Sequence, residues 1–535
     1  MKKFSLICLL LLSTVYSKNT CAQGINTTLV YCDTLQYFQD IMFNPDGSYY
    51  AVGNDTNNNY TALLAKFSAT HSLLWVKKYG GSGVDIFRKI KRMNNGHLVM
   101  MGKTTSADGD VSYGYPMTVG DAWVVVTDSN GNFLRGNVWG YGDETISLDI
   151  NLTSDDKIFL VGVTITHSGD FAINTGPAFE DQVFVALADS QLNKKWLKMF
   201  YSNVSAVPSN NQEMKSDTLI LPISSNEMTG EYNFGTYLGG GSDQLFWFMD
   251  TLGNIHKKIR KGGTQYEGSH AISLTNDHIY AVIGAGSKDG DYFNANDIPA
   301  NYTKYYYSLS KMDIQGNMKW KHLYGPFGAN HSNNVTIQPP RMALTDDEIW
   351  VTHGVYGYDD MWTGSSLGEE DTWILQFDSV GLINRKARIG GTKMDDPYFI
   401  IADPQKRIFL GVITYNSSAG PNTFSCANNS QAGSYKLYEL TKWPNSISDL
   451  KEEIGLLKIS PNPAQNSIRA EWCETMPEKT GKFRVDIYNT EGKSVYSGKV
   501  SQCRVNIDVS RYMKGVYYLI VSTTEKKYTS SFFVN

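Results

Sequence analysis

The chain of 535 residues lacks most of the short sequences that mark familiar enzymes. It has no H-E-x-x-H, no G-x-S-x-G, no P-loop and no G-x-G-x-x-G between a strand and a helix. Zinc proteases, nucleophile-elbow hydrolases and nucleotide-binding enzymes therefore have no support. Beyond the N-terminus, no run approaches the roughly 20 apolar residues of a transmembrane helix. We expect a mature chain without a transmembrane segment.

Cysteine is scarce, and two of the six cysteines lie in an N-terminal segment with the pattern of a secretory signal. A pair of lysines precedes an apolar run over residues 4–12, and small residues further on offer a cleavage site. We predict a signal peptide over residues 1–23. The alternative is a lipoprotein anchor on Cys21, which the polar residues 18–20 make less favourable.

Four cysteines remain after the signal, namely Cys32, Cys426, Cys473 and Cys503. In an exported protein they suggest two disulfide bonds, for which three pairings exist. Because no C-x-x-C is present, a zinc or thiol-redox site has little support.

Charge is distributed unevenly along the chain. Residues 24–456 contain 33 Lys and Arg against 46 Asp and Glu, a net charge of −13. Residues 457–535 contain 12 basic and 7 acidic residues, a net charge of +5. An acidic body repels phosphate backbones, so we do not expect a nucleic-acid partner. The change of sign also indicates a domain boundary.

Two markers recur with a period of about sixty residues, which indicates an internal repeat. One marker is an Asp that opens a tight turn, found as Asp128, Asp189, Asp250, Asp313 and Asp378. The other is a Gly-acid pair, found at 109–110, 169–170, 230–231 and 290–291. Trp123, Phe184 and Trp373 stand five residues before three of the turns and are expected to pack between repeats.

Each repeat has the pattern of four short strands, with a hairpin around the Asp turn. About seven such units over residues 24–445 predict an all-β fold, a seven-bladed β-propeller, followed by a small antiparallel β-sandwich. Six or eight blades, and a linear solenoid, are the alternatives.

The ends of the repeat region favour a closed ring. The last unit stops after its third strand, "SYKLYELTKW", and the mature N-terminus supplies "TTLVYCDTLQYFQD", which resembles a fourth strand. We expect the first strand to complete the last blade. That arrangement would bring Cys32 towards Cys426 and permit a disulfide that closes a very long loop.

After a polar linker over residues 446–456, the pattern changes to alternating strands over residues 457–535. These predict the small sandwich, tied in one of the pairings by Cys473 and Cys503.

The C-terminal segment carries an ordered set of motifs that resembles the C-terminal sorting domain of the type IX secretion system. They are Ser460-Pro461-Asn462-Pro463-Ala464, "VDIYNTEGKSV", Gly515-Val516-Tyr517-Tyr518 and the terminal "SSFFVN". The chain departs from this family in ending on Asn535 rather than on Lys or Arg. The propeller units also resemble the Gly-Asp-x-Trp repeats often joined to such domains.

The resemblance implies a route and a partner. The protein would be secreted or displayed on the surface of a Gram-negative bacterium, with the type IX machinery recognising the C-terminal domain. It implies no activity for the propeller.

Carboxylates collect in the loops on one side of each predicted blade. Those closing the loop after the second strand are Asp121, Asp181, Asp243 and Asp371, and those linking the blades are Asp85, Asp143, Glu267 and Asp395. Four-strand periodicity places both sets on one face, so we expect a dense acidic rim there.

Calcium is the cofactor that this pattern suggests, because oxygen ligands two residues apart with Gly between them suit such an ion. We predict one site at Asp108, Asp110 and Asp121, and another at Asp289 and Asp291. The alternative is that these carboxylates accept backbone N–H groups in their own turns, and repetition favours this alternative.

The sequence therefore predicts a secreted or cell-surface binding or scaffold protein whose ligand is a carbohydrate or another protein. The main alternative is a glycan-active hydrolase or lyase that uses carboxylates of the acidic face. A self-associating surface-layer component is a third interpretation. No catalytic residue is assigned.

Overall fold

The computed structural model describes most of the chain between Ile25 and Asn535. The described residues are 25–33, 36–56, 60–111, 120–140, 145–176, 181–202, 207–208, 212–237, 239, 241–275, 277–285, 287, 289–292, 306–324, 340–346, 348–356, 370–390, 394–414, 434–442, 457–472, 480–489, 493–522 and 527–535. One compact unit spans Ile25–Lys442, and the C-terminal strands belong to a second unit. Among the described residues, no helix has the length and apolar character needed to cross a membrane.

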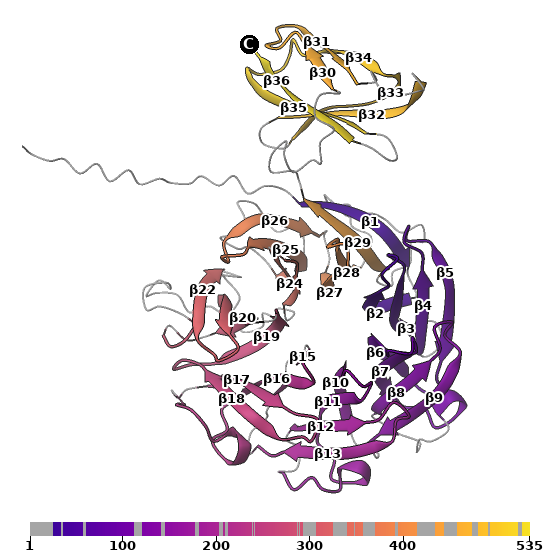
Figure 1. Cartoon of the computed structure of the whole chain (residues 1–535), viewed down its shortest axis with the longest axis vertical. Helices are drawn as coiled ribbons and strands as arrows, with labels where there is room; N and C mark the ends of the chain where they lie inside the picture. Colours follow the sequence, from indigo (N-terminus) through magenta and orange to yellow (C-terminus); the bar gives the residue numbers. More distant parts are fainter. Residues whose placement is uncertain are drawn as a thin grey trace, which may run out of the picture. The chain divides into compact units, whose positions relative to one another are not determined.

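The described strands of the first unit form seven antiparallel sheets arranged in a ring (Figure 1). We number these sheets as blades 1 to 7 in chain order. This all-β architecture confirms the predicted fold class.

Blades 1 to 3 each contain four strands in chain order. Blade 1 has β2 (Gln36–Phe43), β3 (Tyr49–Asp55), β4 (Thr61–Phe67) and β5 (Leu73–Tyr79). Blade 2 has β6 (Asp85–Arg92), β7 (Leu98–Thr104), β8 (Asp121–Thr127) and β9 (Phe133–Trp139). Blade 3 has β10 (Thr145–Leu152), β11 (Ile158–Thr164), β12 (Gln182–Ala188) and β13 (Lys194–Phe200).

Blade 4 is the irregular one, because its innermost position is shared by two short strands. It has β14 (Val207–Pro208), β15 (Glu213–Lys215), β16 (Thr218–Ser225), β17 (Asp243–Met249) and β18 (Ile255–Lys261). Blade 5 has β19 (Glu267–Leu274), β20 (His278–Ala285), β21 (Tyr306–Asp313) and β22 (Met318–Tyr324). Blade 6 has β23 (Arg341–Leu344), β24 (Glu348–Tyr356), β25 (Glu370–Asp378) and β26 (Ile383–Ile389).

Blade 7 joins the two ends of the unit. It has β27 (Asp395–Ala402), β28 (Ile408–Thr414), β29 (Ser434–Lys442) and, as its fourth strand, β1 (Ile25–Asp33). The strand β1 pairs with β29 from Ile25 opposite Lys442 to Asp33 opposite Tyr435. The first strand of the unit therefore closes the ring.

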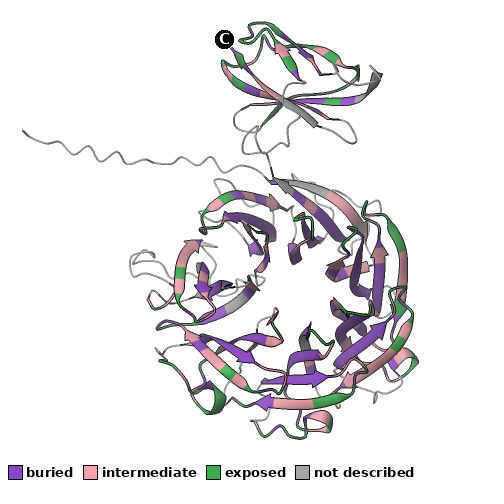
Figure 2. Ribbon diagram, viewed as in Figure 1, coloured by how far each residue is buried: buried purple, intermediate pink, exposed green. Residues whose placement is uncertain are grey.

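Burial follows the position of a strand within its blade (Figure 2). The second and third strands, such as β7 and β8, are buried along almost their whole length because neighbouring blades cover both faces. The fourth strand, such as β5, has half-exposed and exposed side chains. As expected, Trp123, Phe184 and Trp373 are buried, each 1% exposed.

Three of the Gly-acid pairs form a single 3-10 turn, which explains why they recur. These turns are η1 (Gly109–Val111), η2 (Gly169–Phe171) and η3 (Gly230–Tyr232). Their third residues, Val111, Phe171 and Tyr232, are fully buried. Each turn therefore places an apolar or aromatic side chain in the core.

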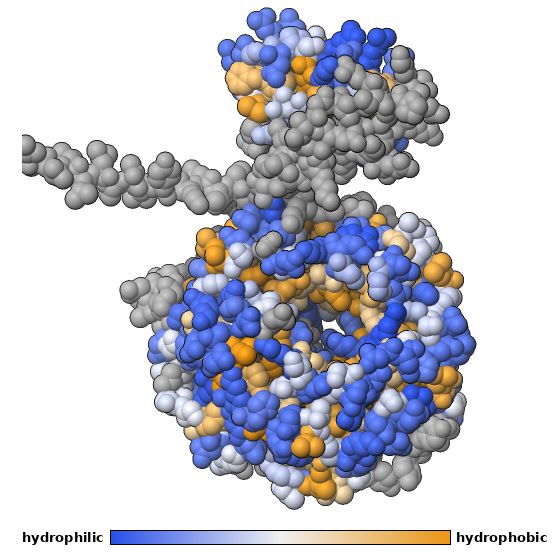
Figure 3. All heavy atoms as spheres, in the orientation of Figure 1, coloured by the Kyte–Doolittle hydropathy of each residue, from blue (hydrophilic) through white to orange (hydrophobic). Residues whose placement is uncertain are grey.

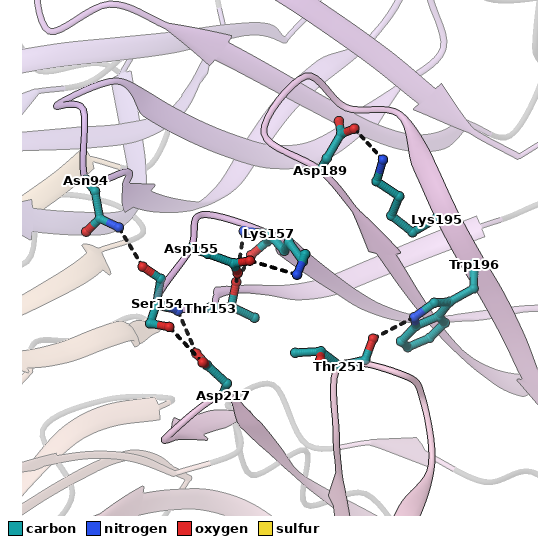
Figure 4. Close-up of polar contacts among 10 residues, drawn as sticks. All are labelled: Asn94, Thr153, Ser154, Asp155, Lys157, Asp189, Lys195, Trp196, Asp217 and Thr251. Carbon is teal, nitrogen blue, oxygen red and sulfur yellow. Dashed lines mark hydrogen bonds and ion pairs between the residues drawn. The ribbon is translucent and has the colours of Figure 1, made fainter.

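Polar contacts tie neighbouring blades together at two distances from the ring axis (Figure 4). Near the axis, Asn94 Nδ2 donates to the Ser154 carbonyl at 2.8 Å, and Ser154 Oγ donates to Asp217 at 2.7 Å. These residues lie on the first turns of blades 2, 3 and 4. Further out, Trp196 Nε1 of blade 3 donates to the Thr251 carbonyl of blade 4 at 2.9 Å.

The second unit contains two antiparallel sheets. One has β30 (Lys458–Ser460), β31 (Ser467–Glu471) and β34 (Arg504–Asp508), and the other has β32 (Thr480–Asn489), β33 (Ser494–Gln502), β35 (Gly515–Ser522) and β36 (Lys527–Val534). Buried residues of both sheets, including Trp472, Phe483 and Leu519, form one apolar core.

Three of the motifs of the C-terminal segment meet around its last strand. The peptide bonds before Pro461 and Pro463 are cis, and the side-chain oxygen of Asn462 between them accepts from the Phe533 amide at 2.9 Å. Tyr517, two residues after Gly515, stacks on Phe532 with ring centroids 5.7 Å apart. The Pro-Asn-Pro loop thus holds the end of the chain in place.

Candidate functional site

The carboxylates at the ends of the strands do not form the exposed acidic rim that the sequence predicts. Those that the structure describes at these positions are 2% exposed or less, with the exception of the half-buried Asp181: Asp85, Asp121, Asp243, Glu267, Asp371 and Asp395. Asp143 lies outside the described residues. The prediction was wrong because these side chains turn inward, against the loops that join one blade to the next.

Asp85 exemplifies this inward position. Its carboxylate accepts from the Gly81 amide at 2.8 Å, from Ser106 Oγ at 2.8 Å and from Thr104 Oγ1. Burial raises its pKa, against the lowering effect of these hydrogen bonds. The carboxylate joins the loop between blades 1 and 2 to the loop after β7, which is a structural task.

Asp108 and Asp110 hold the same linking loop from its outer side. Asp108 Oδ1 accepts from the Ser82 amide at 2.7 Å, and Asp110 Oδ2 accepts from the Gly80 amide at 3.2 Å. The Asp110 amide in turn donates to the Gly80 carbonyl at 3.0 Å. We call this Asp-Gly-Asp arrangement the loop latch.

Blade 5 repeats the loop latch with Asp289, Gly290 and Asp291. Asp289 Oδ1 accepts from the Thr264 amide at 2.8 Å, and Asp291 Oδ2 accepts from the Gly262 amide at 3.1 Å. The other oxygen of Asp291 accepts from Lys261 Nζ at 2.9 Å. The lysine therefore neutralises a carboxylate that the predicted calcium site would need.

The predicted calcium ligands are only partly brought together. Asp108 and Asp110 share the linking loop 80–82, whereas the Asp121 carboxylate faces Gly140 at the next linking loop. Among the described residues, no group of three or more His, Cys, Asp or Glu is placed to hold a metal ion. Calcium at these loops stays a prediction.

The two disulfides also stay predictions. Cys426 and Cys473 lie outside the described residues. Cys32 lies on β1 opposite Lys436 of β29, and Cys503 follows β33. The Cys503 carbonyl accepts from the amide of Trp472, the neighbour of Cys473, at 3.1 Å, which is compatible with the Cys473–Cys503 pairing.

A cavity of about 490 Å³ occupies the centre of the ring. Figure 3 shows the opening from one face of the molecule. Its lining comes from the innermost strands of all seven blades, including Gln39, Arg88, Asp149, Glu213, Ser273, Arg341 and Tyr398. A second cavity of about 640 Å³ shares Asp40, Lys91 and Leu344 with it, so the two form one channel.

A repeated β-bulge builds the wall of this channel. In five blades the pairing of the first strand with the second skips one residue, and these residues are Gln39, Arg88, Leu148, His270 and Tyr398. A bulge redirects a side chain out of the regular alternation. Gln39, Arg88 and Tyr398 accordingly line the cavity.

Glycines opposite the bulge keep this geometry. A Cβ on Gly102 of β7 would lie 1.7 Å from the Ile86 carbonyl oxygen, and one on Gly53 of β3 would lie 1.8 Å from the Tyr37 carbonyl oxygen. No side chain fits at these distances. The residue two positions after the bulge is a buried isoleucine in all five blades, which fixes the strand to the core: Ile41, Ile90, Ile150, Ile272 and Ile400.

The charged side of the channel comes from blades 1 to 4. Asp40 Oδ2 accepts from the Ile90 amide at 3.1 Å, and Asp149 Oδ2 accepts from the Gln212 amide at 3.0 Å, so each Asp bonds to the backbone of the next blade. Burial acts to lower the pKa of Lys91, but the neighbouring Asp149 and Asp40 raise it overall. Lys91 is therefore held in its charged form.

Glu213 is the third acid that lines the cavity. Burial raises its pKa to about 7, although the nearby Lys91 acts to lower it. The remainder of the wall, from blades 6 and 7, contains Arg341 beside the apolar residues Met342, Leu344, Phe399 and Ile401. The channel thus has a charged sector and an apolar sector.

Sequence reasoning missed the channel residues, although the repeats contain a signal for them. When the segments 38–41, 87–90, 147–150, 269–272 and 397–400 are aligned, the last position is Ile in each. The second position is Gln, Arg, Leu, His or Tyr. The first and third positions vary as well, so the signal is the shared Ile, which marks the position of the bulge two residues before it.

Comparison with solved structures returns propellers at low similarity. The WD40 domain of Neurospora crassa Pan2 is 10% identical with a TM-score of 0.39, over 79% of this chain and 96% of that one. A polysaccharide lyase of family PL25, an ulvan lyase, is 9% identical with a TM-score of 0.41, over 74% and 92%. Similarities this low carry no information about ligand or activity. No curated protein matches the chain.

The C-terminal unit has a clear relative. Residues 458–535 match the family model of the secretion system C-terminal sorting domain, which confirms the resemblance seen in the motifs. Such a domain implies interaction with the type IX secretion machinery. The chain is therefore a secreted or cell-surface protein of a Gram-negative bacterium, with a β-propeller ahead of a type IX sorting domain.

Proposed function

We propose that the propeller is a binding module that takes a carbohydrate ligand into its central channel. The observation that carries this proposal is the channel wall, where a fixed bulge presents a different side chain from each of several blades. Ligand sites in proteins are concave, of roughly 300–1,000 Å³, and combine apolar surface with a few placed polar groups. The cavity of about 490 Å³, with a charged and an apolar sector, fits this description.

A central cavity of this volume suits a sugar chain better than a folded partner. A standard protein–protein interface needs about 800 Å² from each side, which is a face rather than a cavity. Carbohydrate units combine hydroxyl groups at their edges with apolar C–H faces. Gln39 and Arg88 offer hydrogen-bond donors, and Tyr398 offers a half-buried aromatic ring, on walls of the same cavity.

Rim carboxylates support catalysis less well than the sequence suggests. A glycosidase needs two carboxyl groups that both reach the substrate. Asp121 and Asp243 are fully buried at their linking loops, and Asp108 accepts a hydrogen bond from Ser82. These surroundings favour a binding module over a rim hydrolase.

The test is a binding screen on the full-length protein. Oligosaccharides of three to six units, neutral and acidic, are titrated by calorimetry against the protein and against Tyr398→Ala. We expect at least one glycan to bind and the variant to weaken it about tenfold, with its melting temperature little changed. Lys195→Gln, on the outer strand β13, is the matched control and should bind as the parent does. Binding that Tyr398→Ala leaves unchanged would contradict a channel site.

A further inference from the structure

We infer that the channel selects an acidic saccharide, whose carboxylate is bound by Arg88 and Lys89 on the bulge of β6 and by Arg341 across the cavity. The inference rests on the proposed function, because it assumes that a carbohydrate occupies the channel. It adds the chemical class of that carbohydrate, a sugar that carries a carboxylate such as a uronic acid.

The distribution of charge is the first argument. Four cationic side chains, Arg88, Lys89, Lys91 and Arg341, line the cavity with three acids, Asp40, Asp149 and Glu213. The mature chain up to residue 456 has a net charge of −13. Cations thus exceed acids by one in the cavity of about 490 Å³, while the adjoining cavity adds Lys406, Asp346 and Asp403 and the surrounding body is acidic. A concavity with an excess of one sign concentrates ligands of the other.

The second argument is that two of the three acids already serve the fold. Asp40 and Asp149 each accept from a backbone amide of the next blade, at 3.1 Å and 3.0 Å. These contacts fix the two carboxylates against the wall, where Asp40 faces Lys89 and Lys91, and Asp149 faces Lys91. Arg88 and Lys89 stand at the bulge, where the chain turns its side chains towards the cavity.

Glu213, the third acid, repels an anion less than a fully ionised carboxylate would. Glu213 faces Lys89 and Lys91 of β6, Asp149 of β10 and Ser273 of β19. Burial raises the pKa of Glu213 to about 7, so this side chain is partly neutral at neutral pH. An entering carboxylate therefore meets less repulsion than the sequence suggests, and still less as the pH falls.

Geometry on the opposite wall supports a sugar rather than a bare anion. Arg341 donates through Nε to the Tyr398 carbonyl at 3.2 Å, which couples a cation to the bulge that carries the aromatic ring. Leu344 and Ile401 extend the apolar sector beside them. A carboxylate on a sugar ring can meet the guanidinium groups while a C–H face meets Tyr398.

The experiment compares two probes of equal length on the full-length protein. Trigalacturonic acid is the acidic probe, and maltotriose and cellotriose are the neutral probes, each titrated by calorimetry at low and moderate salt. We expect trigalacturonic acid to bind at least tenfold more tightly than either neutral sugar, and to weaken as salt rises. Its affinity should also be several-fold higher at pH 6 than at pH 8.

Variants assign the effect to the bulge. Arg88→Gln should weaken trigalacturonic acid about tenfold or more, and Lys89→Gln by a smaller factor, because guanidinium groups bind carboxylates in a bidentate manner. Lys195→Gln removes one positive charge from the outer strand β13 and should have no effect. Unchanged melting temperatures show that each variant is folded, and the two bulge variants serve as alternatives if one is not.

The outcomes separate the inference from the proposed function. Acidic binding that depends on Arg88 or Lys89 supports the inference. Equal or tighter binding of a neutral trisaccharide, lost in Tyr398→Ala, overturns the inference and leaves the proposed function intact. Binding of neither class across the whole screen overturns both.

Discussion

The linking loops and the central channel are built from the same repeats, but they use repetition in opposite ways. At the loops, blades 2 and 5 place Asp-Gly-Asp against a Gly-Gly turn and make the same backbone contacts twice. In the channel, a shared bulge carries Gln39 in blade 1, Arg88 in blade 2 and Tyr398 in blade 7. Repeated residues therefore mark architecture in this protein, and the varied residues at the bulge are those that we propose for recognition.

This contrast makes a measurable claim. Changes at the repeated positions should alter the free energy of unfolding and leave ligand affinity alone in whatever protein still folds. Changes at the varied positions should do the reverse. The predictions below test each side, from the largest expected effect to the smallest.

Gly102→Ala should be the most damaging single change, because its Cβ would collide with the bulge, a repeated feature that also shapes the channel wall. Its Cβ would lie 1.7 Å from the Ile86 carbonyl oxygen and 2.8 Å from the Phe87 Cα, both backbone atoms that cannot swing away. We expect a loss of about 3 kcal/mol or more in the free energy of unfolding, measured by urea denaturation. The bulge would shift, so affinity should fall as well.

The matched control is Gly136→Ala on the outer strand β9. There the closest atom to a new Cβ is Phe133 Cζ at 3.3 Å, a side-chain atom. We expect a change within about 1 kcal/mol. Equal effects of the two substitutions would show that the bulge does not depend on the opposite glycine.

Asp85→Ala should be the next largest effect. It leaves the Gly81 amide and the hydroxyl groups of Thr104 and Ser106 without their acceptor inside the protein. We expect a loss of about 2–4 kcal/mol. Asp108→Ala, at the exposed end of the same loop, should cost about 1 kcal/mol or less. Urea denaturation of both variants shows whether burial determines how much each carboxylate contributes to the free energy of unfolding.

Periodicity predicts the fold of this chain well because each repeat contains the same turn residues and the same strand pattern. The hairpin Asp residues illustrate this: Asp128 Oδ1 accepts from the amides of Asn130 and Asn132 at 2.9 and 2.8 Å. The incomplete last unit and the unpaired first strand likewise lead to the pairing of β1 with β29. Such inferences need only spacing, turn chemistry and the requirement that strands pair.

The candidate site was harder to predict because it depends on which way a side chain points. Strand periodicity placed Asp121 and Asp243 on the correct edge of their blades, yet both turn inward and are fully buried. The bulge at Arg88 shifts the alternation by one residue, and no simple period-two pattern anticipates it. Side-chain direction is thus the information that repetition alone does not contain.

Glu213→Gln tests the channel through its pH dependence. The folded pKa of about 7 lies above the ordinary value of 4.5, so between these limits the folded state binds more protons than the unfolded state. The stability of the parent should therefore fall as pH rises from about 4.5 to 7. The variant lacks this contribution and should be more stable than the parent by about 1–2 kcal/mol at pH 8, and equal near pH 4.

Urea denaturation at pH 4, 6 and 8 measures this difference. Asp243 and Glu267, whose pKa values are raised by burial to about 6 and about 7, add the same sign of slope in both proteins and cancel in the comparison. A parent and a variant with parallel pH profiles would contradict a perturbed acid in the channel.

The smallest expected effect concerns calcium at the loop latches, where the two copies should differ. In blade 5, Lys261 already binds Asp291 at 2.9 Å and competes with a cation. In blade 2 the described contacts of Asp108 and Asp110 are with backbone amides of the linking loop.

If the calcium concentration is ten times the dissociation constant of the site, the free energy of unfolding rises by about 1.4 kcal/mol. We expect that rise to come from blade 2. Melting in EDTA and in millimolar calcium measures it, with Asp108→Ala Asp110→Ala abolishing the shift and Asp289→Ala preserving it. A shift that survives the double variant would place the ion elsewhere, and the absence of any shift would leave both latches as backbone acceptors alone, which is the architectural role that their repetition favours.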